Sequence, residues 1–444
     1  MDFKDADDPG LFCSRFRWVF CQLETLRQCL PQNIPRVLSQ LPSSLDETYE
    51  RILKEIGMVN RHHAYRLLQC LVVAVRPLRV EELAEILALD FDNSRDGLPQ
   101  LKEDWRLDDQ QEAVLSTCSS LITVVRKGYE HVVQFSHFSV KEFLTSDRLA
   151  ASSTEVSHFY ILPEPAHTVV VKACLGILLR PDDGMGYGQP KPSSLVKYAA
   201  EHWVDHTQFE NISMHIEDGM RRLYDPEKPY FEAWLNMYDI DKRWSEFVGD
   251  AIFDGRRGSP LYYASLCGFH DLVAHLVAKH PKDVNATLGQ CLSPLAAALH
   301  ERHFDVAEIL CQNGADVDLT GHRNRTLLHA ALADGFVDIA EWLLAHGANA
   351  MSQQDDCETP LHLATKNKLI NIVQMLLRHD ITIDAKDNYD RTPLHFASDA
   401  GQVEIMRLLL QEGADIAARD LSHSTPLLLT LAWVSDNGQA FDIE

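Results

Sequence analysis

Several motifs that carry chemistry are missing from this sequence of 444 residues. It has no G-x-x-x-x-G-K-[ST] string, the loop whose backbone amides and lysine hold nucleotide phosphates. It also has no G-x-S-x-G, no H-E-x-x-H and no C-x-x-C, so common signatures of hydrolases, zinc proteases and dithiol enzymes are missing as well. Ser, His and Asp are abundant, but nothing in the sequence places them together. We therefore expect a protein that is not an enzyme and holds no cofactor or metal.

Basic residues and long apolar runs are also scarce. The chain has 41 Lys and Arg against 65 Asp and Glu, and the resulting net charge of −24 is spread over both halves. Binding to DNA or RNA usually needs a basic face, so nucleic acid is not an expected partner. The apolar run at 67–75 is far too short to span a bilayer, so no membrane partner is expected. The ten cysteines lie mostly in apolar helical patterns and no signal peptide precedes them, which predicts a cytoplasmic protein and leaves the nucleus open.

One short motif recurs in the second half of the chain. Thr-(Pro/Leu)-Leu-His begins at three threonines spaced 33 residues apart, namely Thr326, Thr359 and Thr392. Related starts stand near residues 259, 293 and 425. A fixed period near 33 residues with this tetrapeptide resembles the ankyrin repeat. We predict ankyrin repeats over 256–432, the last one incomplete, and a C-terminal tail over 433–444.

The motif residues are expected to build the repeats. Each repeat should run as turn, helix, tight turn, helix and loop, with the threonine capping the first helix, proline in its first turn and histidine bonding to the adjacent unit. A glycine should end the second helix in a left-handed turn. In the Thr359 copy Asp380 replaces this glycine, and Lys368-Leu369 replaces a Gly-His pair, so this copy should be the least regular. The structural residues are Thr326, His329, Thr359, Pro360, His362, Thr392, Pro393, His395, Gly314, Gly347 and Gly413.

A stack of such repeats offers one long surface for a protein partner of unknown identity. The candidate contacts stand just before each motif or at the first helices. Aromatic and arginine side chains are favoured anchors in interfaces, so Arg323, Tyr389 and Arg391 are the sharper candidates. The expected partner-binding residues are Arg323, Asn324, Asp355, Asp356, Glu358, Asn388, Tyr389, Asp390, Arg391, Lys366 and Asn367, with Ala333, Asp334, Asp399 and Ala400 alongside them.

The first part of the chain predicts a winged-helix-like domain over 41–150. Helical patterns at 45–56, 62–74, 80–89 and 112–119 precede two β-rich runs within 121–135, and a closing helix follows at 138–144. A nucleic-acid-binding regulator that uses this unit is the alternative function. The 112–119 helix has no Lys or Arg, which weighs against that alternative.

Residues 151–255 predict an α-helical connecting region, with helices at 166–179, 193–205, 214–223 and 246–253. The stretch 184–188 is glycine-rich, but no strand precedes it and no lysine–serine pair follows, so we expect a flexible loop. His202 and His206 share one helix face, where two histidines can bind zinc. No third ligand is indicated, so packing is the expected role. The fold class is mainly α: a winged-helix-like and helical region followed by an ankyrin-repeat α-solenoid.

Three further strings carry a second resemblance: 16–23 (FRWVFCQL), 41–49 (LPSSLDETY) and 135–144 (FSHFSVKEFL). They resemble the segment that follows the NTPase core in fungal NACHT–ankyrin proteins, which are NLR-like switches of the STAND type. The resemblance implies that 1–40 is a helical remnant following a missing NTPase core, in a truncated gene model or a natural short form. It also implies a non-catalytic interaction module, an ankyrin scaffold or sensor, of an NLR-like signalling protein.

Overall fold

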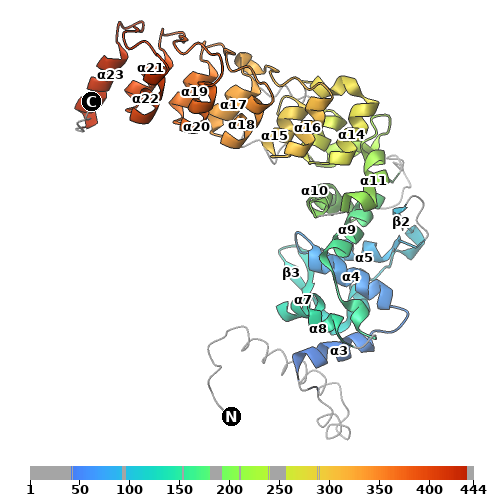
Figure 1. Cartoon of the computed structure of the whole chain (residues 1–444). Helices are drawn as coiled ribbons and strands as arrows, with labels where there is room; N and C mark the ends of the chain where they lie inside the picture. The colour runs from blue at the N-terminus through green and yellow to red at the C-terminus, as the bar shows by residue number, and fades with distance from the viewer. Residues whose placement is uncertain are drawn as a thin grey trace, which may run out of the picture. The chain divides into compact units, whose positions relative to one another are not determined.

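The computed structural model describes residues 42, 44–92, 97–152, 155–180, 193–209, 212–238, 240, 257–287, 289 and 291–437. They belong to two compact units, Met1–Ile240 and Asp241–Glu444 (Figure 1). The predictions for 1–40, for the loop at 184–188, for the helix at 246–253 and for the tail beyond 437 lie outside the described residues. Within the described part, no helix is long and apolar enough to cross a membrane.

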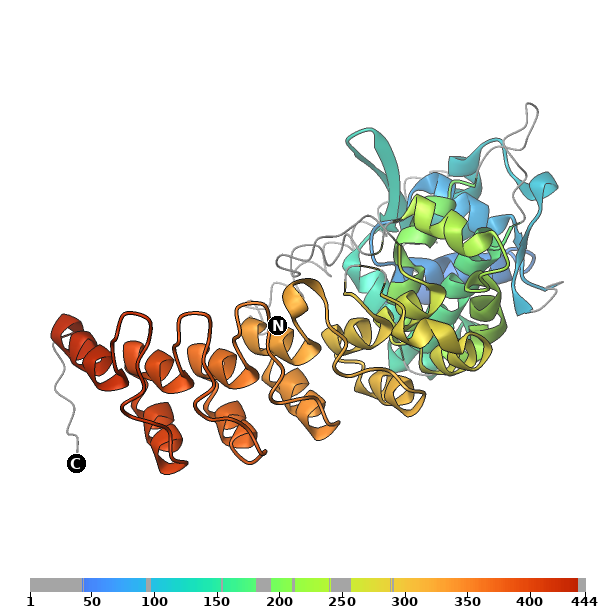
Figure 2. The same ribbon diagram turned by 90° about the horizontal axis from the view of Figure 1, so that it is seen from above.

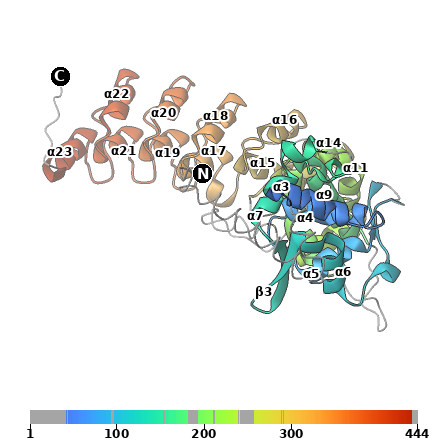
Figure 3. The same cartoon turned by 90° about the horizontal axis from the view of Figure 1, so that it is seen from below.

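The first unit begins with a winged-helix fold. Its elements are α3 (Leu45–Glu55), α4 (Arg61–Val73), α5 (Val80–Leu87), α6 (Gln110–Cys118), β3 (Ile122–Lys127), β4 (Glu130–Phe135), α7 (Phe138–Leu144) and α8 (Asp147–Ala150). The β3–β4 hairpin is antiparallel, with Val124 opposite Val133, and it extends from the helices in Figure 3. Gly128 turns the hairpin with a φ of 63°, a conformation that glycine adopts without a steric penalty. These elements lie where the sequence pattern predicts them.

Local hydrogen bonds explain where these helices start. The Ser44 hydroxyl accepts from the amide of Glu47 at 3.1 Å and so caps α3. His137 caps α7 in the same way, because its Nδ1 accepts from the amide of Ser139 at 3.3 Å. The Ser139 hydroxyl also bonds to the hydroxyl of Tyr49 at 2.8 Å, which joins α7 to α3. The cap and the helix packing are therefore linked.

The segment after α5 is more ordered than the predicted loop at 90–110. It contains the short strands β1 (Leu89–Asp90) and β2 (Gln100–Leu101), paired antiparallel, and a 3-10 helix at Glu103–Trp105. Arg106 anchors the segment through an ion pair of 2.7 Å with the buried Glu85. Leu89 is buried too, so the chain leaves α5 as a strand rather than extending the helix to residue 89.

Among the described residues of the first unit, four further α-helices follow: α9 (Pro163–Leu178), α10 (Val196–Thr207), α11 (Ile212–Leu223) and α12 (Tyr230–Met237). Helix α12 was not predicted. It is held by an aromatic cluster in which Trp234 packs against Trp203 at 5.5 Å and Tyr224 at 5.8 Å between ring centroids. The indole of Trp234 also donates to the carbonyl of Ala200 at 3.0 Å. The spacing of Phe231, Trp234 and Leu235 on one helix face was the available signal.

His206 does not pair with His202 in a metal site. Its ring is fully buried, with Nδ1 at 2.8 Å from Nδ1 of His167 and Nε2 at 2.8 Å from the hydroxyl of Tyr198. His202 bonds to Asp205 instead. Among the described residues, no group of three or more His, Cys, Asp or Glu side chains is arranged to hold a metal ion. The His206 and His167 rings therefore join α10 to α9.

This histidine pair should make the first unit sensitive to acid. Burial lowers the pKa of His206 to about 3 and that of His167 to about 4, from an ordinary value of 6.5. Both rings stay neutral in the folded chain, whereas the unfolded chain binds protons below pH 6.5. Their stabilisation is therefore fully present above pH 6.5 and is lost as the pH falls towards 4. Melting curves at a series of pH values should show this loss.

A paired substitution separates this effect from the protonation of carboxylates. His167→Gln with His206→Gln keeps polar neutral side chains at both positions, so the melting temperature should fall less between pH 6.5 and 4. His202→Gln, on the same helix as His206, serves as the control and should keep the wild-type slope. Equal slopes in the double variant and the wild type would contradict the assignment.

The second unit is a row of helix pairs, and Figure 2 shows them side by side. The pairs are α13 (Pro260–Leu266) with α14 (His270–Lys279), α15 (Pro294–His300) with α16 (Phe304–Gln312), α17 (Leu327–Asp334) with α18 (Val337–Ala345), α19 (Pro360–Lys366) with α20 (Ile370–Leu376), and α21 (Pro393–Asp399) with α22 (Val403–Gln411). A single helix, α23 (Pro426–Asn437), follows. The first helices pack against one another from α13 to α15 and from α17 through α19 and α21 to α23, so apolar faces are buried by stacking.

Residues in left-handed backbone conformation end the second helices of most repeats. Gly314, Gly347 and Gly413 have φ values of +87°, +85° and +93° after the second helices, as expected. Asp380 is not left-handed, and α20 is two residues shorter than α18 and α22. Between the helices of this repeat Lys368 adopts a φ of 60°, where three other repeats have a glycine and the Ser293 repeat has Arg302, also at 60°. The Thr359 repeat thus keeps the turn between its helices but ends its second helix early.

Lys368→Gly should therefore stabilise the repeats. A residue with a Cβ in the left-handed region carries a steric penalty that glycine avoids, so we expect a gain of about 1 kcal/mol in the free energy of unfolding. Urea denaturation followed by circular dichroism measures the difference. Lys366→Gly, two residues earlier in α19, is the control and should destabilise instead, because glycine is unfavourable within a helix. A loss of stability in Lys368→Gly would refute the strain argument.

Candidate protein-binding surface

The Thr–His motif positions the first helix of each central repeat. The threonines Thr326, Thr359 and Thr392 cap α17, α19 and α21, and each lies next to the histidine three residues later. In the Thr359 repeat, the threonine amide donates to Nδ1 of His362 at 3.1 Å. Since Nδ1 accepts, Nε2 carries the proton and donates.

The same histidines connect successive repeats. Nε2 of His362 reaches the carbonyl of Arg391 at 3.1 Å, and Nε2 of His395 reaches the carbonyl of Ser424 at 3.2 Å. His329 is equally buried and lies beside the carbonyl of Glu358, and burial lowers its pKa to about 4. In the first repeat Tyr262 takes this position, and its hydroxyl accepts from the amide of Cys291 at 3.1 Å. These residues set the spacing of the repeats.

The loops before each motif form fingers, and backbone hydrogen bonds link one finger to the next. The amide of Asp355 donates to the carbonyl of Arg323 at 2.9 Å. The backbone amide of Asn388 donates to the carbonyl of Asp356, and the backbone amide of Leu421 donates to the carbonyl of Tyr389, both at 3.0 Å. The tips are thus held at a regular spacing. We call their exposed residues the fingertip ridge: His322, Arg323, Asp355, Asp356, Asn388, Tyr389, Leu421 and Ser422.

Three of the expected contact residues bond to neighbouring repeats. The side-chain amide of Asn324 donates to the backbone carbonyl of Gln353 at 2.9 Å. The side-chain amide of Asn388 donates to the backbone carbonyl of Asp355 at 3.2 Å. Asn367 donates to the carbonyl of Leu332 at 2.9 Å, in the last turn of α17. Their side chains are exposed, yet their amide groups stabilise the stack.

Glu358 was expected on the surface, and the structure corrects this. Its side chain is buried, where it accepts from the side chain of Gln354 at 2.9 Å and pairs with Lys366 at 3.4 Å. Arg391 stands at the equivalent position one repeat later, with Asp387 as its partner at 2.8 Å. This position lies at the base of the finger, where side chains bond within the repeat.

Arg391 is therefore less available than expected. Its guanidinium is held by the buried Asp387 and lies over the rings of Phe396 at 4.3 Å and Tyr389 at 5.0 Å. Asp390 is half-buried and pairs with Lys386 at 3.6 Å. The Tyr389 ring is exposed, and the Arg391 guanidinium packs against it.

The expected contacts on the ridge are Arg323, Asp355, Asp356, Asn388 and Tyr389. Leu421, which is also exposed, was not predicted. It lies 33 residues after Asn388, so the repeat period alone could have located it. From Arg323 onward the ridge changes from cationic to acidic, then to aromatic and aliphatic. Such a mixed surface is suited to recognising a protein.

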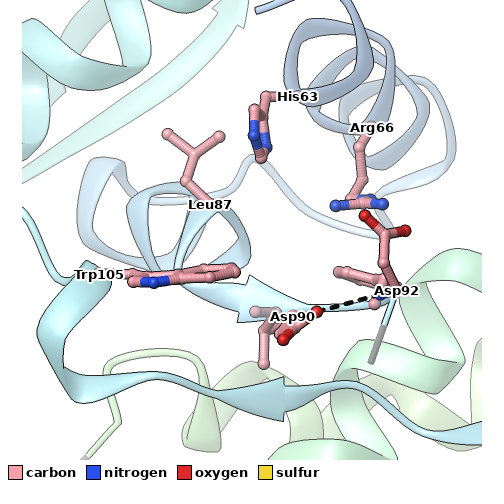
Figure 4. Close-up of a pocket in the computed structure, with 8 residues that line it drawn as sticks. His63, Arg66, Leu87, Asp90, Asp92 and Trp105 are labelled. Atoms are coloured by element: carbon pink, nitrogen blue, oxygen red, sulfur yellow. Dashed lines mark hydrogen bonds between the residues drawn. The ribbon is translucent and has the colours of Figure 1, made fainter. Parts of the chain in front are cut away.

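A small cavity of about 390 Å³ lies in the first unit (Figure 4). Trp105 and Leu87 line it beside His63, while Arg66 faces Asp92. Its charged groups lie beside opposite charges, because Arg66 faces Asp92 and Lys102 approaches Asp90 at 3.8 Å. Arg66 also lies over the ring of Phe91 at 3.9 Å. Burial and the neighbouring Arg66 lower the pKa of His63. The cavity lining contains no serine or cysteine.

Comparison with known families identifies the two kinds of domain. Residues 261–354 and 328–420 match the family model for ankyrin repeats (3 copies). Residues 49–155 match the model for the winged helix domain of GPI inositol-deacylase. The chain therefore carries ankyrin repeats, a class of module that mediates protein–protein interactions, together with a winged-helix domain.

Two curated relatives are fungal proteins. Azaphilone pigments biosynthesis cluster protein L of Monascus ruber is 31% identical over 288 residues, which cover 61% of this chain and 59% of that protein. Vegetative incompatibility protein HET-E-1 of Podospora anserina is 25% identical over 214 residues, which cover 43% of this chain and 15% of that protein. The chain thus spans less than two thirds of either relative.

Proposed function

We propose that this chain is a non-catalytic protein-binding module that recognises a partner through the fingertip ridge. The observation that carries the proposal is the row of exposed side chains on tips linked by backbone hydrogen bonds of 2.9–3.0 Å. Such a surface loses little conformational freedom on binding, which favours affinity. Arg323 and Tyr389 are its anchors.

The biological setting we propose is NLR-like signalling in a fungal cytoplasm. The similarity to a vegetative incompatibility protein supports it, as do ankyrin repeats joined to a winged-helix domain. The buried thiols of Cys70, Cys118 and Cys174 fit a reducing compartment. In this setting the repeats sense a protein ligand.

The absence of catalysis is a separate part of the proposal. Nucleotide binding is the activity that the resemblance to NACHT proteins makes most relevant to test. Isothermal titration of the purified chain with ATP and magnesium should show no binding. Binding with micromolar affinity would overturn the non-catalytic assignment.

The alternative through the winged-helix domain receives little support. Helix α6, the third helix before the hairpin, has the acidic Glu112 and no Lys or Arg. The hairpin tip has Lys127 and a fully exposed Tyr129, but this is a small basic surface for phosphate contacts. We therefore do not propose nucleic acid as the partner.

Capture of the partner tests the proposed function. The immobilised chain is exposed to an extract of the source organism, and the retained proteins are identified by mass spectrometry. Asp355→Lys with Asp356→Lys reverses the charge at the centre of the ridge, so a specific partner should be lost. Glu404→Lys with Glu412→Lys, two exposed positions in and just after α22, is the matched control and should retain it. If both variants retain the same proteins, the ridge is not the binding surface.

A further inference from the structure

Helix α23 exposes leucines at positions that are buried in the preceding repeats. Leu427, Leu428 and Leu431 are 50%, 53% and 54% exposed. The side chains one and two periods earlier are at most 2% exposed: Leu361, His362, Thr365, Leu394, His395 and Ser398. These positions form the stacking face towards the next repeat. The leucine face of α23, formed by Leu427, Leu428 and Leu431, is therefore a stacking face that no described residue covers.

Its chemistry differs from that of an ordinary stacking face. At position 428 leucine stands where the three preceding repeats have His329, His362 and His395, whereas the position of Leu431 is also leucine in the Thr326 repeat (Leu332). In the earlier repeats the histidine bonds to a carbonyl of the next repeat, at 3.1 Å for His362. A further repeat of that kind would bring its carbonyl against Leu428, which has no donor. The face therefore suits an apolar occupant better than another Thr–His repeat.

We propose that the leucine face of α23 packs against the same face of a second copy about a two-fold axis. Residues 426–434 contain no charged side chain, so two copies can meet there without burying a charge. A self-complementary patch that pairs through a two-fold axis is the commonest form of homodimer. The contact also continues the first-helix stacking seen between α21 and α23.

The strength of the association follows from its size and charge. Three leucines make a patch smaller than a standard interface, so the association should be weak and visible only at high protein concentration. Each copy carries a net charge of −24, so repulsion opposes pairing and added salt should strengthen it. The dimer presents two fingertip ridges, which would give avidity for a multivalent partner. Self-association itself does not depend on the proposed function.

Sedimentation velocity on the full chain tests the proposal. The mass should rise from 50.3 kDa towards twice that value as concentration increases, and at lower concentrations when salt is added. Leu427→Asp with Leu431→Asp should stay monomeric throughout. Leu421→Asp is the control, since it is 62% exposed but lies on the fingertip ridge, and it should dimerise like the wild type. Thermal melts should coincide for all three chains, because the replaced side chains are already exposed.

A cross-link tests the geometry. Leu428→Cys should form a disulfide between two copies in oxidising buffer, seen by mass spectrometry as the 428–428 peptide pair. A wild-type chain that stays monomeric, with α23 covered by residues 438–444 or by another protein, overturns the proposal. A dimer that persists in the Leu427→Asp, Leu431→Asp variant also overturns it. An open-ended polymer overturns it too, because it would indicate head-to-tail contacts.

Discussion

His362→Ala is expected to lower the free energy of unfolding of the repeats by about 3 kcal/mol. The ring is fully buried, accepts from the amide of Thr359 at 3.1 Å and donates to the carbonyl of Arg391 at 3.1 Å. Its removal weakens the cap of α19 and the link to the next repeat, and it leaves a cavity. Repeat stability is nearly a sum of neighbour interfaces, so the loss at one interface should be visible in the whole array. Urea unfolding followed by circular dichroism measures it.

His379→Ala is the matched control, because it removes an exposed imidazole from the same repeat. Its effect should stay within about 0.5 kcal/mol, as for most surface substitutions. Equal unfolding midpoints for His362→Ala and His379→Ala would show that the buried histidine does not couple the repeats.

Arg323→Ala with Tyr389→Ala should weaken partner binding on the order of 100-fold and leave the melting temperature unchanged. Interface anchors contribute roughly 1–2 kcal/mol or more each, and arginine and tyrosine are prominent among them. Both side chains are exposed on the ridge, so their removal opens no cavity. Surface plasmon resonance with the captured partner gives the dissociation constant, and calorimetry gives the melting temperature.

The control for this pair replaces the same two residue types at positions outside the fingertip ridge. Arg378→Ala with Tyr129→Ala removes one exposed arginine and one exposed tyrosine away from the ridge. Binding should remain within about twofold of the wild type. If both double variants bind equally well, Arg323 and Tyr389 are not anchors.

The repeats were predictable because their determinants are local. A threonine cap, a proline in the first turn and a glycine in a left-handed turn each act within a few residues, and the period of 33 repeats them. The winged-helix hairpin was predictable for the same reason, since two runs rich in β-branched residues flank Gly128. Helix α12 escaped prediction because Trp234 is buried by residues distant in sequence, such as Trp203.

The candidate surface was only partly predictable. The sequence placed it on the fingers, but the roles of single residues depend on atoms in the next repeat. Asn388 bonds to a carbonyl of the preceding finger, and Glu358 is drawn inward by Gln354 and Lys366. Periodicity shows which positions are equivalent, but it does not show which side chains are already bonded within the molecule.

Amide hydrogen exchange on the chain with and without its partner tests the central claim most directly. The account predicts slower exchange at the fingertip ridge, at residues 322–323, 355–356, 388–389 and 421–422, when the partner is bound. Little change should occur in the winged-helix domain. Protection confined to residues 44–240, with the fingertips unchanged, would contradict the account.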